Sequence, residues 1–316
     1  MRNTFLQTLT ELAVDHPEIM FLTGDLGFGV VEQFRDRCPN QFVNMGAAEQ
    51  NMVGVATGLA SRGFVPFTYS IINFSVLRPL EFIRNGPIAH QVPVRIVGVG
   101  PGFEYGSNGP THYGVEDIAC LRSFGGIDIH VPADVRRAKA TLEREWNSSR
   151  PLYFRLSKDD KLVVPELDEA IDFHGFCALV GRSDTFAHVA IVCLGSAIEE
   201  GLKARRLLSR SNIVAELICV ELINDDTIAR LAAHVSKHRS VVTVEAHSVR
   251  GGMGSALAES LGELGGERTL KRLGIQAIPN FVGTQKTLES ASGFDASGIV
   301  AAVESMVFER VGESTR

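Results

Sequence analysis

Short, continuous apolar runs recur along this chain, and stretches typical of helices lie between them. A strand buried on both faces of a parallel sheet has a continuous apolar sequence, because helices cover both faces. In the first half these runs are Ile19–Thr23, Val65–Tyr69, Val94–Val99, Ile127–Val131 and Leu152–Leu156. The pattern predicts an α/β fold with a mainly parallel sheet. A helix is expected between the second and third runs, at Leu77–Ala89.

A second series of the same kind follows a charged, turn-rich connection at residues 158–172. We expect its strands at Val189–Leu194, Ala215–Val220 and Ser240–Glu245, and its helices at Ala197–Leu208, Asp226–Ser236 and Gly254–Gly262. A chain of 316 residues is long enough for two domains, each with its own core. We therefore predict two α/β domains with mainly parallel sheets, at residues 1–165 and 173–316.

Composition and charge argue against several classes of protein. Hydrophobic residues make up 45% of the chain and charged residues 22%, as in ordinary globular proteins. The net charge of −6 gives no reason to expect nucleic acid or a membrane surface as a partner. No uninterrupted apolar stretch reaches the roughly 18 residues that suggest a membrane span. The five cysteines are scattered without CxxC spacing, which argues against disulfides or zinc and favours a cytoplasmic protein.

One carboxylate lies among small residues in the segment Asn44–Met52 (NMGAAEQNM). There a short extended run ending at Val43 gives way to a helix-like stretch, Val53–Ala60. Burying a lone carboxylate costs free energy, so Glu49 is a candidate functional residue. The alternative is a glutamate that the helix dipole stabilises at a helix N-terminus.

Two glycine clusters invite comparison with nucleotide-binding loops. The first, Gly98–Gly102, contains Pro101, which lacks a backbone donor. The second, Gly251–Ser255, precedes a predicted helix, so its amides could hold an anion. We favour the alternative, a tight turn that lets helix and strand pack closely. Neither cluster has the dinucleotide-binding pattern.

Four motifs in register carry a resemblance to a known family. They are Asn44–Met52, Gly63–Phe74 (GFVPFTYSIINF), Gly109–His112 (GPTH) and Val131–Asp134 (VPAD). Their order and spacing resemble the pyrimidine-binding domain of thiamine-diphosphate enzymes of the transketolase and deoxyxylulose-phosphate synthase family. The similarity covers nearly the whole chain, more weakly after about residue 170. It implies a pyrimidine-binding domain followed by a transketolase C-terminal domain, with thiamine diphosphate as cofactor.

The resemblance also implies roles for individual residues. Glu49 matches the catalytic glutamate that contacts ring nitrogen N1′ of the cofactor's aminopyrimidine. Phe74 matches the aromatic residue that stacks on this ring, and Ile71 lies nearby in the same pocket. His112 matches a histidine of the substrate channel, which polarises a carbonyl or relays a proton.

The substrate half of the site departs from the family pattern. Gly100 stands where transketolases have a histidine that helps hold the substrate phosphate. Asn108 stands where they have an acidic residue that contacts sugar hydroxyls. Lys158, with Arg155 three residues earlier, stands where they have a phosphate-binding arginine. We therefore expect these residues to bind a changed or non-phosphorylated sugar.

The family's magnesium and diphosphate site is not recognisable in this sequence. That site is a Gly-Asp-Gly followed by an Asn-containing turn, and Asp25 is followed by Leu26. The resemblance thus implies the C-terminal subunit of a split transketolase, with no metal ligands of its own. An N-terminal, diphosphate-binding subunit would be the partner and would hold most of the Mg²⁺ site. Self-association through the C-terminal domain would give an α2β2 heterotetramer.

The leading hypothesis is the pyrimidine-domain subunit of a two-subunit transketolase, which transfers a two-carbon ketol unit from a ketose to an aldose-type acceptor. The beta subunit of a 2-oxo-acid dehydrogenase and an acyloin-condensing enzyme similar to deoxyxylulose-phosphate synthase are alternatives. A regulatory or scaffolding relic of the fold is a non-enzymatic alternative. Retention of Glu49, Phe74 and His112 together argues against such a relic.

Overall fold

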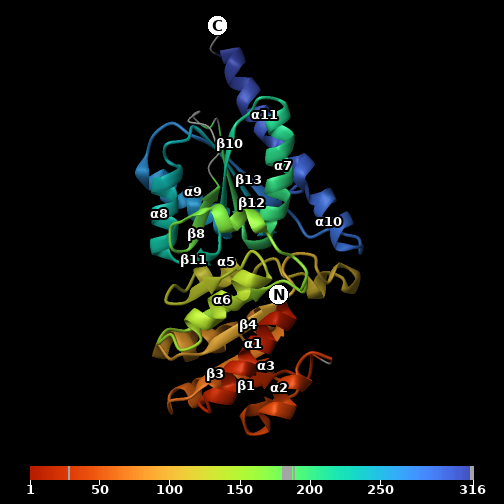
Figure 1. Cartoon of the computed structure of the whole chain (residues 1–316), viewed down its shortest axis with the longest axis vertical. Helices are drawn as coiled ribbons and strands as arrows, with labels where there is room; N and C mark the ends of the chain where they lie inside the picture. Colours follow the sequence, from red (N-terminus) through yellow and green to blue (C-terminus); the bar gives the residue numbers. More distant parts are fainter. Residues whose placement is uncertain (28, 180–186, 188, 314–316) are drawn as a thin grey trace.

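The computed structural model describes residues 1–27, 29–179, 187 and 189–313. These residues form two α/β halves stacked along the long axis of the molecule, the first half below the second in Figure 1. Each half is built around its own sheet. The predicted fold class, α/β with mainly parallel sheets, is confirmed.

The first sheet has seven strands, and all neighbours except β11 and β5 pair in parallel. In spatial order they are β11 (Leu222–Ile223), β5 (Asp128–His130), β6 (Leu152–Leu156), β4 (Arg95–Val99), β3 (Val65–Ile71), β1 (Ile19–Thr23) and β2 (Phe42–Asn44). The helices of this half are α1 (Arg2–Asp15), α2 (Glu32–Arg37), α3 (Glu49–Ala60), α4 (Leu80–Ile83), α5 (Asp117–Arg122) and α6 (Val135–Glu145). Strand β11 comes from the second half of the sequence, so the two halves share this sheet.

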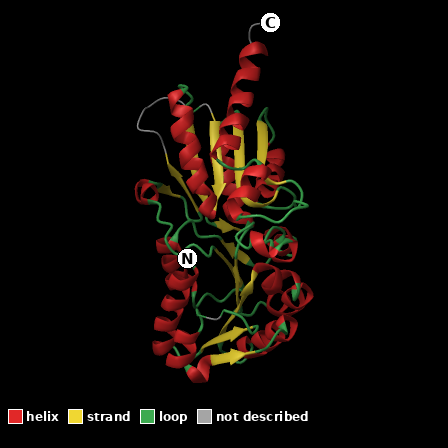
Figure 2. Ribbon diagram, turned by 90° about the vertical axis from the view of Figure 1, so that its right-hand side faces the viewer, coloured by secondary structure: helices red, strands yellow, loops and turns green. Residues whose placement is uncertain are grey.

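The second sheet has six strands, parallel from β13 to β10 and antiparallel at β8 and β7. In spatial order they are β13 (Thr269–Ile275), β12 (Ser240–Ser248), β9 (Val189–Leu194), β10 (Ala215–Val220), β8 (Phe176–Leu179) and β7 (Ile171–Asp172). The helices are α7 (Ile198–Arg210), α8 (Asp225–Val235), α9 (Met253–Leu264), α10 (Gln285–Ser292) and α11 (Ala296–Glu313). Helices flank the strands of this half on both sides (Figure 2).

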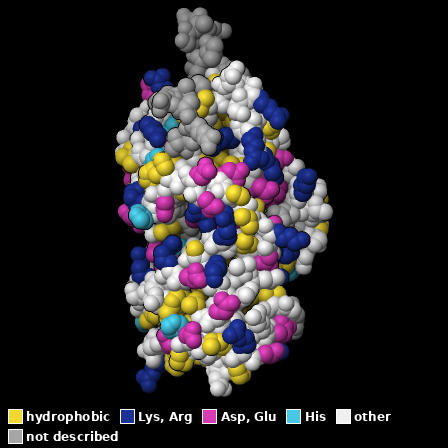
Figure 3. Space-filling view, in the orientation of Figure 1, with side chains coloured by type: hydrophobic (Ala, Val, Ile, Leu, Met, Phe, Trp, Pro, Cys, Tyr) yellow, Lys and Arg dark blue, Asp and Glu magenta, His cyan; other side chains and the backbone are white. Residues whose placement is uncertain are grey.

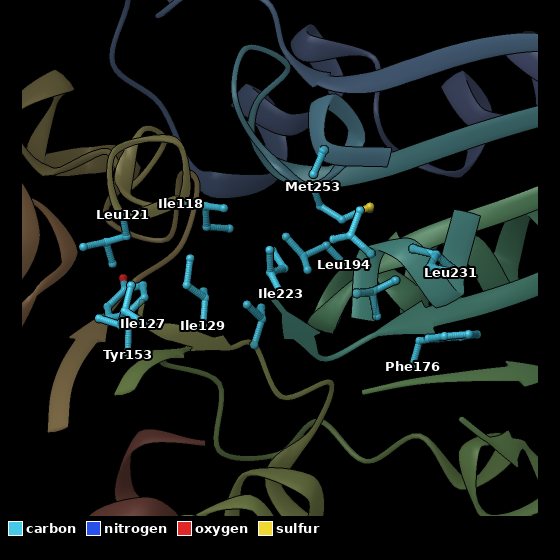
Figure 4. Close-up of a cluster of buried hydrophobic side chains, with 14 of the residues drawn as sticks. Ile118, Leu121, Ile127, Ile129, Tyr153, Phe176, Leu194, Ile223, Leu231 and Met253 are labelled. Carbon is cyan, nitrogen blue, oxygen red and sulfur yellow. The ribbon is translucent and has the colours of Figure 1, made fainter. Parts of the chain in front are cut away.

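Four of the strands that form from the continuous apolar runs are buried along their whole length. Every residue of β4, β6, β9 and β10 is buried. A single apolar cluster continues from the first half into the second (Figure 4). Ile129 and Tyr153 contribute to it from the first half, and Leu194, Ile223 and Met253 from the second. This shared core holds the two halves together.

The helix predicted at Leu77–Ala89 is interrupted. The segment consists of the π-helical turn η2 (Asn73–Leu77), the short helix α4 and a second π-helical turn, η3 (Arg84–Ile88). Pro79 is the N-cap of α4, and Pro87 lies inside η3. Proline removes a backbone donor and clashes with the preceding turn, which accounts for the irregular helix.

Other groups of the chain accept hydrogen bonds from backbone amides of the two glycine clusters. At the start of α9 the amides of Met253 and Gly254 donate to the carboxylate of Glu245, at 2.8 and 2.9 Å. In the first cluster the Gly102 amide donates to the carbonyl of Gly114 at 2.8 Å. The Gly251–Ser255 cluster is therefore the tight turn that we favoured, because the carboxylate of Glu245 already accepts hydrogen bonds from its amides.

The surface and the cysteines agree with the composition. Basic and acidic side chains are interspersed over the face shown in Figure 3. The cysteines are free thiols: Cys38, Cys120, Cys177, Cys193 and Cys219. Within the part of the chain that the structure describes, every helix is too short or too polar to cross a membrane.

Candidate active site

Five parallel strands of the first sheet end at the same edge. Thr23 at the end of β1 pairs with Asn44 at the end of β2, and Val99 of β4 pairs with both Ile71 of β3 and Leu156 of β6. The segments that follow these strands contain five of the predicted site residues, namely Glu49, Phe74, Asn108, His112 and Lys158. Open α/β sheets bind ligands at the carboxyl ends of their strands, so the candidate site lies where the fold favours one.

Glu49 is the first residue of α3, and its side chain is 2% exposed. Its Oε2 accepts a hydrogen bond from Nη1 of Arg78 at 2.6 Å. Its Oε1 faces Gly24, where a Cβ atom would lie 3.3 Å away. The sequence suggested a lone buried carboxylate, but the structure pairs it with a cation, Arg78.

Asn44 fixes the turn that precedes Glu49. Its Oδ1 accepts from the amides of Asp25 at 3.1 Å and Gly46 at 3.0 Å, and its Nδ2 donates to Oδ1 of Asp25 at 3.0 Å. Asp25 and Gly46 have positive φ angles of 54° and 70°, in the left-handed region. The loops after β1 and β2 are thereby tied together beside the carboxylate.

Phe74 lies between Arg78 and His112. The guanidinium carbon of Arg78 is 4.4 Å from the centroid of the Phe74 ring, a cation–π distance. The His112 ring meets the Phe74 ring edge-on, with centroids 5.3 Å apart and planes at 76°. Asn73 Nδ2 donates to the carbonyl of Tyr113 at 2.9 Å, which ties the two segments together. Glu49, Phe74 and His112 are thus brought together, with Arg78 connecting the first two.

The residues predicted on the substrate side form a second group around Tyr105. Its ring centroid is 6.3 Å from that of His112, and Nζ of Lys158 lies 4.1 Å from the centroid. Gly100 has φ of 91°, and a Cβ atom there would lie 2.2 Å from Cε2 of Tyr105. The ring of Tyr105 therefore fills the space beside Gly100, and a larger residue at position 100 requires that ring to move.

Glu104 supports Lys158 from behind. Its carboxylate accepts from the Lys158 amide at 2.6 Å and from the hydroxyl of Ser157, and its carbonyl accepts from Lys158 Nζ at 3.1 Å. Burial raises the pKa of Glu104 to about 7, against these hydrogen bonds. A cavity of about 190 Å³ adjoins this group and is lined from both halves, including by Glu200 and Phe294.

Arg155 is not part of either group. Its side chain is 2% exposed, and Nε and Nη2 bind the carboxylate of Asp117 at 2.8 and 3.2 Å. Nη2 also donates to the carbonyls of Gly114 and Ala246, and the Tyr153 hydroxyl donates to Asp117. We expected Arg155 to contact substrate, but the structure places it in a buried network that joins the two halves.

Asn108 and Ile71 lie at the edges of the site. Asn108 is exposed at the end of the 3₁₀ turn η4 (Gly106–Asn108), with Ser107 Oγ 3.3 Å from its Oδ1. Ile71 is partly buried at the end of β3. Their proposed contacts with sugar and cofactor stay predictions.

Sequence reasoning missed Arg78, Tyr105 and Glu104. Arg78 follows Phe74 by four residues, a spacing at which side chains of a helix meet. The sequence could therefore have indicated the contact between these two side chains. Tyr105 and Glu104 lie in an irregular loop, where spacing carries no such information. Among the described residues, no group of three or more His, Cys, Asp or Glu side chains could hold a metal ion.

Comparisons with known proteins found matches to both halves of the chain. The family model for the transketolase pyrimidine-binding domain matches residues 1–161, and the model for the transketolase C-terminal domain matches residues 182–299. A putative transketolase C-terminal section from Methanocaldococcus jannaschii is 30% identical over 95% of this chain and 93% of its own length. A 6-deoxy-6-sulfo-D-fructose transketolase subunit from a Clostridium species is 30% identical over 96% of this chain and 92% of its own.

A solved structure has the same fold along nearly the whole chain. A split-gene transketolase, described as an inactive beta4 tetramer, superposes with a TM-score of 0.81 and 28% sequence identity. The match covers 96% of this chain and 97% of that one.

Proposed function

The chain belongs to the transketolase family, and from this premise we propose that it is the pyrimidine-binding subunit of a two-subunit transketolase. Such an enzyme transfers a two-carbon ketol unit from a ketose donor to an aldose-type acceptor. The observation that carries the proposal is the buried carboxylate of Glu49, which Arg78 connects to the Phe74 ring, with the His112 ring in T-shaped contact with Phe74.

The residues present fit the aminopyrimidine of thiamine diphosphate. The Arg78 guanidinium, a flat group with N–H donors, donates to Glu49 and lies over Phe74. An aminopyrimidine is also flat and carries N–H groups, so it suits the same two surfaces. When bound, the cofactor would supply the carbon nucleophile and electron sink for two-carbon transfer.

Glu49 and Phe74 would act on the pyrimidine ring, and His112 on the substrate. Glu49 would hold a proton at ring nitrogen N1′, while Phe74 supports the face of the ring, with Ile71 as a further apolar contact. Nδ1 of His112 lies 2.9 Å from Oγ1 of Thr111. This leaves Nε2 as the nitrogen that would exchange a proton with the substrate carbonyl oxygen.

The acceptor end favours an anionic sugar derivative. Lys158 presents an ammonium group over Tyr105, and a lysine binds anions as a point charge without the two-pronged geometry of arginine. The site should therefore accept anionic groups of varied shape. A relative that covers nearly the whole chain acts, by its name, on a sulfonated sugar. Asn108 would contact sugar hydroxyls.

The proposal includes a partner subunit. The diphosphate and Mg²⁺ would be held mainly by an N-terminal transketolase subunit, and this chain would self-associate through its C-terminal domain to give α2β2. The similarity to a split-gene transketolase supports a partner. We keep the proposed domains at residues 1–165 and 173–316, since each contains most of one sheet. The five free thiols favour the cytoplasm.

The test is two-carbon transfer by the reconstituted pair of subunits with thiamine diphosphate and Mg²⁺. A substrate panel would compare xylulose 5-phosphate plus ribose 5-phosphate with non-phosphorylated, nucleotide-linked and sulfonated sugars. We expect transfer that depends on the cofactor and is weaker with the ordinary pentose phosphates. The absence of transfer with every donor and acceptor would contradict the proposed function, whereas full efficiency with the pentose phosphates would contradict the substrate preference alone.

A further inference from the structure

We propose that Arg78 is a gating residue of the cofactor pocket. Its guanidinium holds the place that the aminopyrimidine takes and has to turn away before that ring can bind. This inference rests on the proposed function, because it presumes that Glu49 and Phe74 receive the pyrimidine.

The carboxylate of Glu49 is closed on both sides. Oε2 accepts a hydrogen bond from Arg78 at 2.6 Å. Oε1 lies so close to Gly24 that a Cβ atom at that position would be 3.3 Å away. Glu49 is 2% exposed, whereas Arg78 is 44% exposed. Arg78 is therefore the outer member of the pair, and a ligand that approaches Glu49 from solvent has to displace it.

The same guanidinium covers the aromatic ring. Its central carbon lies 4.4 Å from the Phe74 centroid, so the face of the ring is in contact with Arg78. The His112 ring packs against Phe74 in a T-shaped arrangement, with the two ring planes at 76°. One planar cation thus occupies both surfaces that a pyrimidine needs.

The pair also has a physical reason to form. A buried, unpaired carboxylate costs several kcal/mol or shifts toward its neutral form. The ion pair with Arg78 removes that cost while the pocket contains no pyrimidine ring. The side chain can still leave, because Arg78 is 44% exposed and an aminopyrimidine that takes its place contacts the same carboxylate and ring. Arg78 lies between η2 and α4, where its long side chain can rotate toward solvent without unfolding a regular helix.

The test measures binding of the pyrimidine half of the cofactor, 4-amino-5-hydroxymethyl-2-methylpyrimidine, to the full chain without a partner. This probe lacks the diphosphate, so it reports on the pyrimidine pocket alone. Calorimetry or ligand-observed NMR would give its affinity for wild type, Arg78→Ala and Arg78→Lys. We expect Arg78→Ala to bind roughly tenfold more tightly than wild type, because the ion pair and the cation–π contact of Arg78 no longer compete with the probe.

Two variants serve as comparisons. Arg78→Lys keeps the charge but loses the flat group, so its affinity should lie between those of Arg78→Ala and wild type. Arg84→Ala removes an exposed arginine from the same irregular segment and should bind like wild type. A thermal unfolding curve for each variant establishes that it is folded.

The outcomes separate gating from the proposed function. Equal or weaker binding by Arg78→Ala overturns the gate, provided that Glu49→Ala weakens binding in the same background. If Glu49→Ala has no effect on binding, or if no variant binds the probe, Glu49 does not form a pyrimidine site and both proposals fail. Tighter binding by Arg78→Ala that depends on Glu49 supports both.

Discussion

The two ends of the candidate site present charge in different ways. At one end a carboxylate, Glu49, is buried and an arginine covers it from the solvent side. At the other end a lysine lies over an aromatic ring, and a carboxylate, Glu104, supports it from behind. The first arrangement suits a carboxylate that binds one defined chemical group of a ligand. The second leaves a cation at the surface of the site, where it can bind anions of several shapes.

The largest effect is expected at the Glu49 end. Glu49→Gln should lower the rate of two-carbon transfer by at least about 100-fold, since a neutral amide cannot hold the proton at N1′. Steady-state assays of the reconstituted pair measure this. Glu81 is an exposed glutamate of α4, so Glu81→Gln is the matched control and should behave as wild type. Near wild-type turnover by Glu49→Gln would contradict the catalytic role of Glu49, and with it the contrast drawn between the two ends of the site.

His112 lies between the two ends, and its replacement should have the next largest effect. His112→Ala should lower kcat and kcat/KM together, by roughly 10- to 100-fold, as expected for an interaction made in the transition state. The same assays give both constants. A rise in KM at unchanged kcat would place His112 with the substrate-binding residues instead.

A smaller effect is expected at the Lys158 end. Lys158→Ala should raise KM roughly tenfold for phosphorylated or sulfonated substrates, which is about 1.4 kcal/mol of lost binding to a charged group, and should leave kcat nearly unchanged. Uncharged sugars should be affected little. Lys161→Ala, at an exposed lysine in the following loop, is a suitable control. An equal change in KM for charged and uncharged sugars would argue against anion binding at this end.

The smallest effect concerns the stability of the loop behind Lys158. Because the pKa of Glu104 is raised to about 7 in the folded chain, folding takes up a proton between its ordinary pKa of 4.5 and that value. Its contribution to stability is fully present below pH 4.5 and is lost as the pH rises through 7. In urea unfolding at pH 5 and pH 8, Glu104 should therefore contribute a fall in the free energy of unfolding with rising pH, against His130 and His247, whose pKa values burial lowers to about 4 and which act in the opposite direction.

Glu104→Gln should make that fall shallower, because the amide does not titrate. Part of the fall should persist, since burial also raises the pKa of Glu245 to about 7. A variant with the full wild-type slope would show that Glu104 is not held in its neutral form.

Strands of the sheets differ in how far the sequence could predict them. The strands β1 and β6 were predicted to the residue, because a strand that is mostly or fully buried has a continuous apolar sequence. Strand β13 was not predicted, because Lys271 and Arg272 interrupt its apolar sequence and most of its first residues face solvent. Strand β8 has four residues after a turn-rich connection, which is too short for a periodicity to be seen.

The same distinction holds within the site. Motif matches identified Glu49, Phe74 and His112, and the structure brings these three together. Arg78 lies 29 residues from Glu49, so its contact depends on the tertiary fold and has no local signature. Arg155 and Lys158 are three residues apart but lie in different surroundings, because β6 ends at Leu156 and the chain then leaves the buried sheet.

The central claim, that this chain provides only the pyrimidine half of a thiamine-diphosphate site, is tested most directly by calorimetry. Thiamine diphosphate with Mg²⁺ would be titrated into the chain alone and into the chain mixed with the N-terminal subunit of a split transketolase. We predict no tight binding to the chain alone and restored affinity once the partner supplies the diphosphate site. Tight binding to the chain alone would contradict the claim.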